Sequence, residues 1–222
     1  MDWTAFSLSV QLGLATLVLL LPLSVALGRT LAVRRFPGHH LVEALVALPL
    51  ILPPTVVGFY LLVAFGSRSW LGGFFTSLTG GTLAFSFEGL VLASMLVNLP
   101  FAVQPIQRAF ESIPRDVREA AACCGLSWWR ALAAIELPLA WPGIATAGVL
   151  TFAHTLGEFG VVLMVGGNIP AETRTLSIAI YDRVQAFDDR GAGVMAATLL
   201  VFVTAALAAT NVLSRRVARR HV

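Results

Sequence analysis

Residues whose side chains could perform chemistry are few in this sequence. His154 beside Thr155 is the one suggestion of a base next to a hydroxyl nucleophile, which a membrane-embedded hydrolase would need. No Ser/His/Asp set, phosphate-binding loop or dinucleotide fingerprint accompanies this pair. Because a lone histidine beside a helix usually serves packing or hydrogen bonding, we predict a non-catalytic protein.

The cysteines and histidines do not form a metal-ligand pattern. Cys123 and Cys124 are adjacent, so a disulfide between them would be strained. His39 and His40 are neighbours, and the other two histidines stand alone in the sequence. We therefore predict no disulfide framework, no bound metal and no cofactor.

Two polar residues lie inside or beside apolar runs and need partners there. An acid such as Glu158 is expensive at the end of a membrane span unless it meets water or a partner. Hydrogen bonds from broken backbone near Gly157 and Gly160, or an ion pair with Arg174, are the expected structural roles, and substrate contact is the alternative. Asn98 is a candidate for interhelical hydrogen bonding or for a transport pathway.

The composition determines what kind of element must position these residues. Hydrophobic residues make up 57% of the 222 positions and charged residues only 12%, against about 25% in an ordinary soluble domain. The 15 basic residues are all arginine, and they cluster beside apolar segments rather than on one amphipathic face. This distribution is a membrane-orientation signal, so we predict a membrane protein that binds lipid and no nucleic acid.

The lengths of the uncharged runs predict about five transmembrane helices. A spanning helix needs roughly 20 apolar residues to cross the hydrocarbon core. The first run has Asp2 before it and no basic leader, so we expect a retained helix rather than a cleaved signal sequence. We predict an all-α, polytopic membrane bundle forming one transmembrane domain over residues 1–222. The predicted spans are residues 6–27, 44–65, 89–107, 137–157 and 191–214.

Two apolar segments are predicted to depart from a straight span. Pro49, Pro53 and Pro54 lie in the second run, where each lacks a backbone donor and kinks or breaks the helix. Such a break serves either as a packing kink or as a lining of the pathway, because freed carbonyls need a protein or water partner. Residues 159–171 are too short to span, so we predict a re-entrant segment, with a sixth span as the alternative.

The arginines predict the orientation of the chain. With five spans, one set of loops and termini carries 11 arginines and the other carries 4. Cytoplasmic loops retain arginine, so we predict the N-terminus outside and the C-terminus in the cytoplasm.

The loop at residues 111–138 belongs to the arginine-rich set and has helical signals of its own. Pro114 suits a first helical turn and Gly125 suits a C-terminal cap, which predicts a helix of roughly 11 residues. Val117, Ala121 and Cys124 then share one face. Downstream, we expect a second turn that presents two tryptophans.

The same loop contains seven residues at characteristic spacings, namely Glu119, Ala120, Ala121, Gly125, Ile135, Leu137 and Pro138. Their types and spacing resemble the loop motif of binding-protein-dependent ABC importer permeases. In that family the loop forms a coupling helix that docks into a groove of a cytoplasmic ATPase. The alternative is an amphipathic helix lying on the membrane surface.

A second resemblance points to the substrate class. Residues 156–160, 165–170, 172–175 and 177–181, together with 48–54, are similar to molybdate permease subunits of ABC importers. Sulfate permease subunits share a related Gly-Glu-Phe-Gly element, so a sulfate or thiosulfate permease is the alternative within this class. A self-sufficient channel or secondary transporter is a further alternative, but such proteins usually have internal repeats, which this sequence lacks.

The resemblance implies an assembly and a location. We expect a type I ABC importer permease in the bacterial inner membrane, working as a homodimer with the pathway at its interface. Its expected partners are two copies of a cytoplasmic ABC ATPase and a periplasmic or lipid-anchored oxyanion-binding protein. Molybdate is the expected substrate, with tungstate also accepted.

Overall fold

Helices make up nearly all of the described chain. The structure is a computed structural model that describes the backbone of residues 1–218 and the side chains of residues 1–208. Within that part no strand occurs, which agrees with the predicted all-α fold class. The elements in chain order are α1 (Trp3–Val33), α2 (His39–Ile51), α3 (Pro54–Phe65), α4 (Trp70–Thr79), α5 (Phe87–Glu111), α6 (Arg115–Cys123), α7 (Trp128–Ala131), the π-helical turn η1 (Leu132–Glu136), α8 (Leu137–Gly157), α9 (Gly160–Gly166), α10 (Leu176–Gln185) and α11 (Asp189–Ala218).

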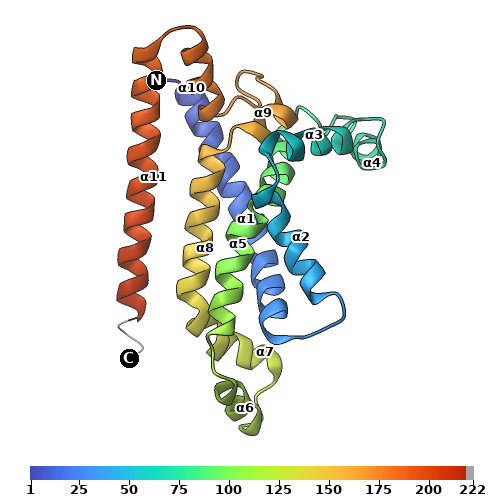
Figure 1. The fold of residues 1–222 in the computed structure, drawn as a ribbon, viewed down its shortest axis with the longest axis vertical. Coiled ribbons are helices and arrows are strands. Elements are labelled where there is room, and N and C mark those ends of the chain that lie inside the picture. Colours follow the sequence, from blue (N-terminus) through green and yellow to red (C-terminus); the bar gives the residue numbers. More distant parts are fainter. Residues whose placement is uncertain (219–222) are drawn as a thin grey trace.

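Three long helices, α1, α5 and α8, form the centre of the bundle. They run side by side along the long axis, and α11 packs on α8 (Figure 1). Ile106 and Phe110 of α5 are fully buried in a cluster that includes Ala140 of α8. At Gly143 a Cβ atom would lie 2.4 Å from the Cβ of Ala109, so glycine lets α8 and α5 approach closely.

The described part of the structure has four to five long apolar segments, against the prediction of about five spans. Among the described residues, Trp3–Val33, Phe87–Glu111, Trp128–Gly157 and Asp189–Ala208 are long and apolar enough to cross a membrane. A fifth span exists if the bent pair α2 and α3 is counted as one. The residues of the predicted spans 6–27, 89–107 and 137–157 lie inside such helices, while the span predicted at 191–214 extends beyond the described side chains.

The departure from a straight span that the prolines predict within residues 44–65 is confirmed. α2 ends at Ile51, α3 begins at Pro54, and the two axes differ by 110°. The break follows from the prolines, because the residue before a proline is pushed out of helical geometry. Leu52 and Pro53 are accordingly extended, with ψ of 142° and 135°. Consequently α3 lies across the bundle rather than along it (Figure 1).

The helix that contains the fourth predicted span, 137–157, begins earlier than that span. It starts at Trp128 and passes without interruption through η1 into α8, so Pro138 does not open it. In η1 the N–H of Leu137 bonds to the carbonyl of Leu132, five residues back. Because the hydrogen-bond ladder is already shifted at this point, the missing N–H of Pro138 is accommodated inside a continuous helix.

Short helices occupy the end of the molecule opposite α6. The segment predicted as re-entrant, 159–171, contains the seven-residue helix α9, which packs on α3 and α5 and is too short to cross a bilayer. The lateral helices α4 and α10 lie at the same end, and neither was predicted from the sequence (Figure 1). No sixth span occurs among the described residues.

Asp188 begins α11. Its Oδ1 accepts the N–H of Gly191 at 2.9 Å, and its Oδ2 lies 2.6 Å from Nη1 of Arg183. The backbone hydrogen bond from Gly191, followed by the Arg183 guanidinium, holds the pKa of this exposed carboxyl below its usual range. Asp188 therefore stays ionised at the positive end of α11.

Loops alternate between the two ends of the bundle, as the five-span arrangement requires. The turn between α1 and α2 lies at the end that carries α6 and α7, whereas α4 and α10 lie at the other (Figure 1). Arg29, Arg118 and Arg130 belong to the α6 end. Arg219 and Arg220, which were counted with this end in the sequence, lie outside the described residues. That the α6 end faces the cytoplasm stays a prediction.

Candidate functional site

The helix predicted within the loop at residues 111–138 is present as α6. Pro114 is its N-cap, with ψ of 144°, one position earlier than the predicted first turn. Gly125 has φ of +72°, a left-handed conformation that favours glycine. The N–H of Leu126 bonds to the Ala121 carbonyl at 3.1 Å, and that of Gly125 to the Ala122 carbonyl at 2.9 Å. These two bonds are a Schellman motif, so the helix ends as predicted, although at nine residues it is shorter.

The two faces of α6 have different environments. Ala121 is buried, and Val117 packs on the cluster formed around Ile106 and Phe110. Glu119 and Ala120 are exposed. Of the three consecutive motif residues, Ala121 therefore faces the bundle, whereas Glu119 and Ala120 are accessible to solvent.

One residue of the predicted inner face does not lie there. Cys124 was expected to share the face of Val117 and Ala121, but it is exposed, as is Cys123. The reason is that Cys124 is the C-cap, with ψ of 6°, and has already left helical geometry. Both cysteines are free thiols.

The last three motif residues, Ile135, Leu137 and Pro138, lie at the same end of the bundle as α6. Leu137 is half-buried and packs on the cluster that also receives Val117, while Ile135 is half-buried and Pro138 is exposed. Val117 of α6 and the motif residue Leu137 thus pack on the same apolar cluster. This shared cluster is the packing unit that joins α6 to the start of α8 at the base of the bundle.

A buried ion-pair cluster, formed by Arg29, Arg118 and Glu136, lies beside this packing unit. The Glu136 side chain is only 4% exposed. Its Oε2 lies 2.6 Å from Nε of Arg29, and its Oε1 lies 3.0 Å from Nη2 of Arg29 and 3.5 Å from Nε of Arg118. Sequence reasoning missed Glu136. The sequence did contain a signal, because Glu136 is an acid between the apolar motif residues Ile135 and Leu137 and several arginines lie in loops predicted at the same end.

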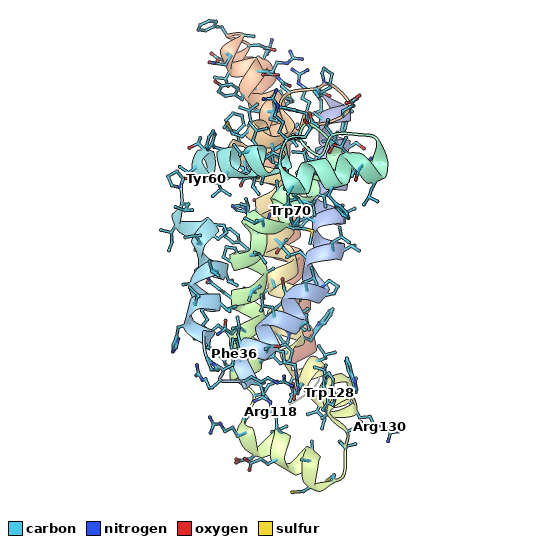
Figure 2. All side chains as sticks on the ribbon, turned by 90° about the vertical axis from the view of Figure 1, so that its right-hand side faces the viewer. Phe36, Tyr60, Trp70, Arg118, Trp128 and Arg130 are labelled. Atoms are coloured by element: carbon cyan, nitrogen blue, oxygen red, sulfur yellow. The ribbon has the colours of Figure 1, made fainter. Side chains whose placement is uncertain are left out.

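The tryptophans of α7 stand at the edge of this region. Trp128 and Trp129 are exposed and stacked, with ring centroids 3.7 Å apart. The guanidinium carbon of Arg29 lies 5.6 Å from the centroid of Trp128. Figure 2 shows Arg118 near Trp128 at the end of the bundle above α6, while Arg130 projects outward.

Glu158, between α8 and α9, has the structural partners that one of the predicted roles requires. Its Oε1 accepts the N–H of Val161 at 3.2 Å, which supplies the expected hydrogen bond from broken backbone. Its Oε2 lies 3.7 Å from Nε2 of His154. The predicted ion pair with Arg174 is wrong, because Arg174 pairs with Asp182, eight residues further on and close to it across the turn into α10.

The two glycines near Glu158, Gly157 and Gly160, differ in the space around them. A Cβ at Gly160 would lie 2.8 Å from the Cβ of Pro54, so Gly160 lets α9 contact the start of α3. Gly157 ends α8 and has open space around it. Pro53 is the exposed N-cap of α3. Gly160 and Pro54 thus meet at the corner of the broken helix.

Asn98 makes the interhelical hydrogen bonds that its sequence position suggested. It is completely buried in α5 and donates from Nδ2 to Oγ1 of Thr155 on α8 at 3.1 Å. Its Oδ1 lies 3.2 Å from Nδ1 of His154, whose ring stacks on Phe101 at 4.1 Å. His154 therefore has packing and hydrogen-bonding partners. A cavity of about 120 Å³ at this corner is lined by Pro54, Phe101, His154 and Glu158 among others.

Comparison with known proteins gives one family and several relatives. Residues 14–220 match the family model described as binding-protein-dependent transport system inner membrane component. The chain is 45% identical over 201 residues to the molybdenum transport system permease protein ModB of Azotobacter vinelandii, covering 90% of this chain and 89% of that one. Identity to ModB of Escherichia coli K12 is 39% over 184 residues, with 83% and 80% covered.

More distant similarities also extend over most of the chain. Identity to the probable sulfate transport system permease protein cysT of Chlorella vulgaris is 32% over 177 residues, covering 80% of this chain and 66% of that one. Among solved structures, a chain of a bacterial alginate ABC transporter in complex with an alginate-pentasaccharide-bound periplasmic protein superposes with a TM-score of 0.77. It is 19% identical, and the match covers 96% of this chain and 78% of that one. The last similarity concerns the fold alone.

Proposed function

Because the chain belongs to the binding-protein-dependent transport system inner membrane components, we propose that it is the permease subunit of an ATP-driven importer that brings molybdate into the bacterial cell. It is a multi-pass protein of the inner membrane. The observation that carries the proposal is the geometry of α6, whose Schellman-capped helix presents Glu119 and Ala120 to solvent at one end of a helical bundle.

The energy for transport comes from a partner in this proposal. Moving a dianion inward against about 100 mV, negative inside, costs roughly 4.6 kcal/mol, which corresponds to about a thousandfold exclusion at equilibrium. The sequence of this chain contains no phosphate-binding loop. A cytoplasmic ATPase therefore has to supply the energy and has to contact the permease.

The exposed side of α6 is the proposed contact for that ATPase. Alanine at position 120 lets another protein approach the helix backbone closely, and Glu119 offers a carboxylate for a charged or hydrogen-bonding partner. Two permease copies would each dock one ATPase, because a symmetric dimer repeats the same surface. Ile135, Leu137 and Pro138 support the loop from the bundle side.

The transport pathway is proposed at the interface of the two permease copies. The break at Pro53 and Pro54 exposes backbone that lacks helical partners, and such backbone is tolerated at membrane depth only against protein or water. The corner formed by Pro54, Gly160 and Glu158 is therefore the candidate lining. A carboxylate repels a passing oxyanion, so Glu158 serves the backbone there rather than the substrate.

Sequence identity to known permeases favours molybdate over sulfate as the substrate. The molybdenum permease relative is 45% identical over 90% of this chain, against 32% over 80% for the sulfate permease relative. Oxyanions of equal charge differ in size, and a separate binding protein with preorganised donors can select one radius. The permease then accepts what its binding protein delivers, which includes tungstate.

Reconstitution tests the proposal. The permease, its ATPase and its binding protein are placed in vesicles, and accumulation of labelled molybdate is compared with that of labelled sulfate. We expect ATP-dependent accumulation of molybdate, competition by tungstate and little uptake of sulfate. A clear preference for sulfate would overturn the substrate, and uptake by the permease alone would overturn the importer class.

A further inference from the structure

The ion-pair cluster of Arg29, Arg118 and Glu136 joins three separate elements at one carboxylate. Arg29 belongs to α1, Arg118 to α6, and Glu136 ends η1 at the start of α8. The side chains of Arg29 and Arg118 are only 17% and 20% exposed, so water screens these charges weakly. Arginine and carboxylate in this geometry form strong, directional hydrogen bonds.

The π turn sets the direction of Glu136. In η1 the backbone bond skips one residue more than in an α-helix, as the Leu137 to Leu132 bond records. One inserted residue offsets the helix faces on either side by about 100°. The turn therefore lets α7 carry Trp128 beside Arg29 while the end of η1, eight residues later, buries Glu136 against Arg29 and Arg118.

Arg118 also fastens α6 to the end of α5. Its Nη2 donates to the carbonyl of Phe110 at 2.7 Å, and its Nη1 donates to the carbonyl of Ile113 at 3.3 Å. Its Nε lies 3.5 Å from Oε1 of Glu136 and forms an ion pair without a hydrogen bond. The guanidinium of Arg118 is thus held by two backbone carbonyls and faces the Glu136 carboxylate at the end of η1.

A helix as short as α6 needs such contacts to keep a fixed orientation. Isolated helices below about 12 residues are marginal in water, and α6 has nine residues. Two small apolar side chains of α6 contact the bundle. Ala121 is buried, and Val117 is half-buried. The charged cluster supplies a directional restraint that these two side chains do not.

We propose that Glu136 is a positioning residue that couples α6 to the transmembrane bundle. By holding Arg118 of α6 and Arg29 of α1 on one carboxylate, it makes a displacement of α6 move α1 and α8 together. This inference rests on the proposed function, in which the ATPase acts on α6. Without the carboxylate, α6 remains attached through Phe110 and Ile113 but moves independently of α1 and α8.

The first test measures the order of α6 in the purified permease. A nitroxide is attached to Cys124 in a Cys123→Ser background, since both thiols are exposed and the sequence has no other cysteine. Glu136→Gln keeps the shape of the side chain and removes its charge. We expect the label to become more mobile in this variant, with an intermediate change in Glu136→Asp.

Glu43→Gln is the matched control. Glu43 lies near the same end of the bundle and accepts a hydrogen bond from Gln107 at 2.8 Å, so it also joins two helices, α2 and α5. It is not bonded to α6, and its replacement should leave the label at Cys124 unchanged. Equal mobility in Glu136→Gln and the parent, or an equal increase in Glu43→Gln, would overturn the proposed role of Glu136.

The second test uses the complete transporter, with Cys123 and Cys124 unmodified. Glu136→Gln should retain the ATPase and its basal hydrolysis, while stimulation by loaded binding protein and substrate uptake fall by about tenfold, within the range of allosteric coupling. Loss of stability without loss of stimulation would assign a merely structural role. Failure of the unmutated permease to retain an ATPase would refute the proposed function instead, and the mobility experiment would still decide whether Glu136 positions α6.

Discussion

Glu136 of η1 accepts two hydrogen bonds from Arg29 of α1, at 2.6 and 3.0 Å, across 107 positions of sequence. A carboxylate that is 4% exposed would be costly without this partner. The pair therefore fixes the lower end of α1 against α8 at the level where α6 meets the bundle. This pair links α1 to η1 and α8, which are far apart in sequence, at the base of the bundle.

Removing Arg29 should destabilise the permease. Arg29→Ala leaves Glu136 buried with only the longer contact to Arg118, and loss of one partner of a buried pair costs about 3 kcal/mol. Thermal unfolding in detergent should show a clear loss relative to Arg130→Ala, which removes an exposed arginine near the same end. Equal melting temperatures for the two variants would contradict the importance of the pair.

The end of α6 should depend on the conformation of residue 125. Gly125 has φ of +72° with open space around it, so a side chain there is strained by the backbone and not by a collision. Gly125→Val should leave the protein in the membrane but weaken ATPase association and abolish uptake, because a left-handed β-branched residue costs more than about 1 kcal/mol.

Gly125→Asn is the control for this prediction. Asparagine tolerates the left-handed conformation, so it should preserve much of the uptake that valine loses. If both variants were equally inactive, the size of the side chain would be responsible rather than the helix cap. If both were fully active, the cap would have no part in coupling.

Charge reversal at Glu119 should affect the partner and spare the fold. The side chain is exposed, and surface substitutions away from packed features change stability by about 0.5 kcal/mol or less. Glu119→Lys should therefore keep the melting temperature while reducing co-purification of the ATPase and abolishing uptake. Glu111→Lys reverses another exposed carboxylate at the same end, outside α6, and should retain the ATPase. Normal uptake by Glu119→Lys would remove Glu119 from the mechanism.

The long helices and the end of α6 could be predicted because they depend on local signals. The apolar runs are long enough to define α1, α5 and α8, and Gly125 supplies a conformation that few other residues adopt. The prolines likewise predicted a break near Pro53. The 110° angle at that break could not be predicted, because it is set by packing of α3 on α9.

Features that depend on tertiary contacts were missed. Glu136 marked the edge of a predicted span, since a charge usually ends an apolar run, whereas the π turn and two arginines bury it within a longer helix. Arg174 was assigned to Glu158 as an available opposite charge, although the turn into α10 brings Asp182 closer. Pairing among several possible charges depends on backbone geometry that sequence spacing does not contain.

Close packing of α8 on α5 should make position 143 intolerant of a side chain. A Cβ there would lie 2.4 Å from the Cβ of Ala109 and 2.9 Å from the carbonyl oxygen of Pro105, so Gly143→Ala must separate the helices. Overpacking of this kind costs about 1–3 kcal/mol. Gly193→Ala on α11 adds the same methyl group in open space and should be neutral or slightly stabilising. Equal melting temperatures for the two variants would show that α8 and α5 are packed less closely.

The orientation of the bundle should be visible through its thiols. Cys123 and Cys124 are exposed on the α6 end, which we assign to the cytoplasm, so an impermeant thiol reagent should not label the unmodified permease in intact cells. After both cysteines are replaced by serine, Arg68→Cys and Phe187→Cys place exposed thiols at the opposite end, and each should react from outside. Permeabilised cells supply the control, because there the native cysteines should react as well. Labelling of Cys123 or Cys124 in intact cells, with protection of positions 68 and 187, would reverse the orientation and move α6 out of reach of a cytoplasmic ATPase.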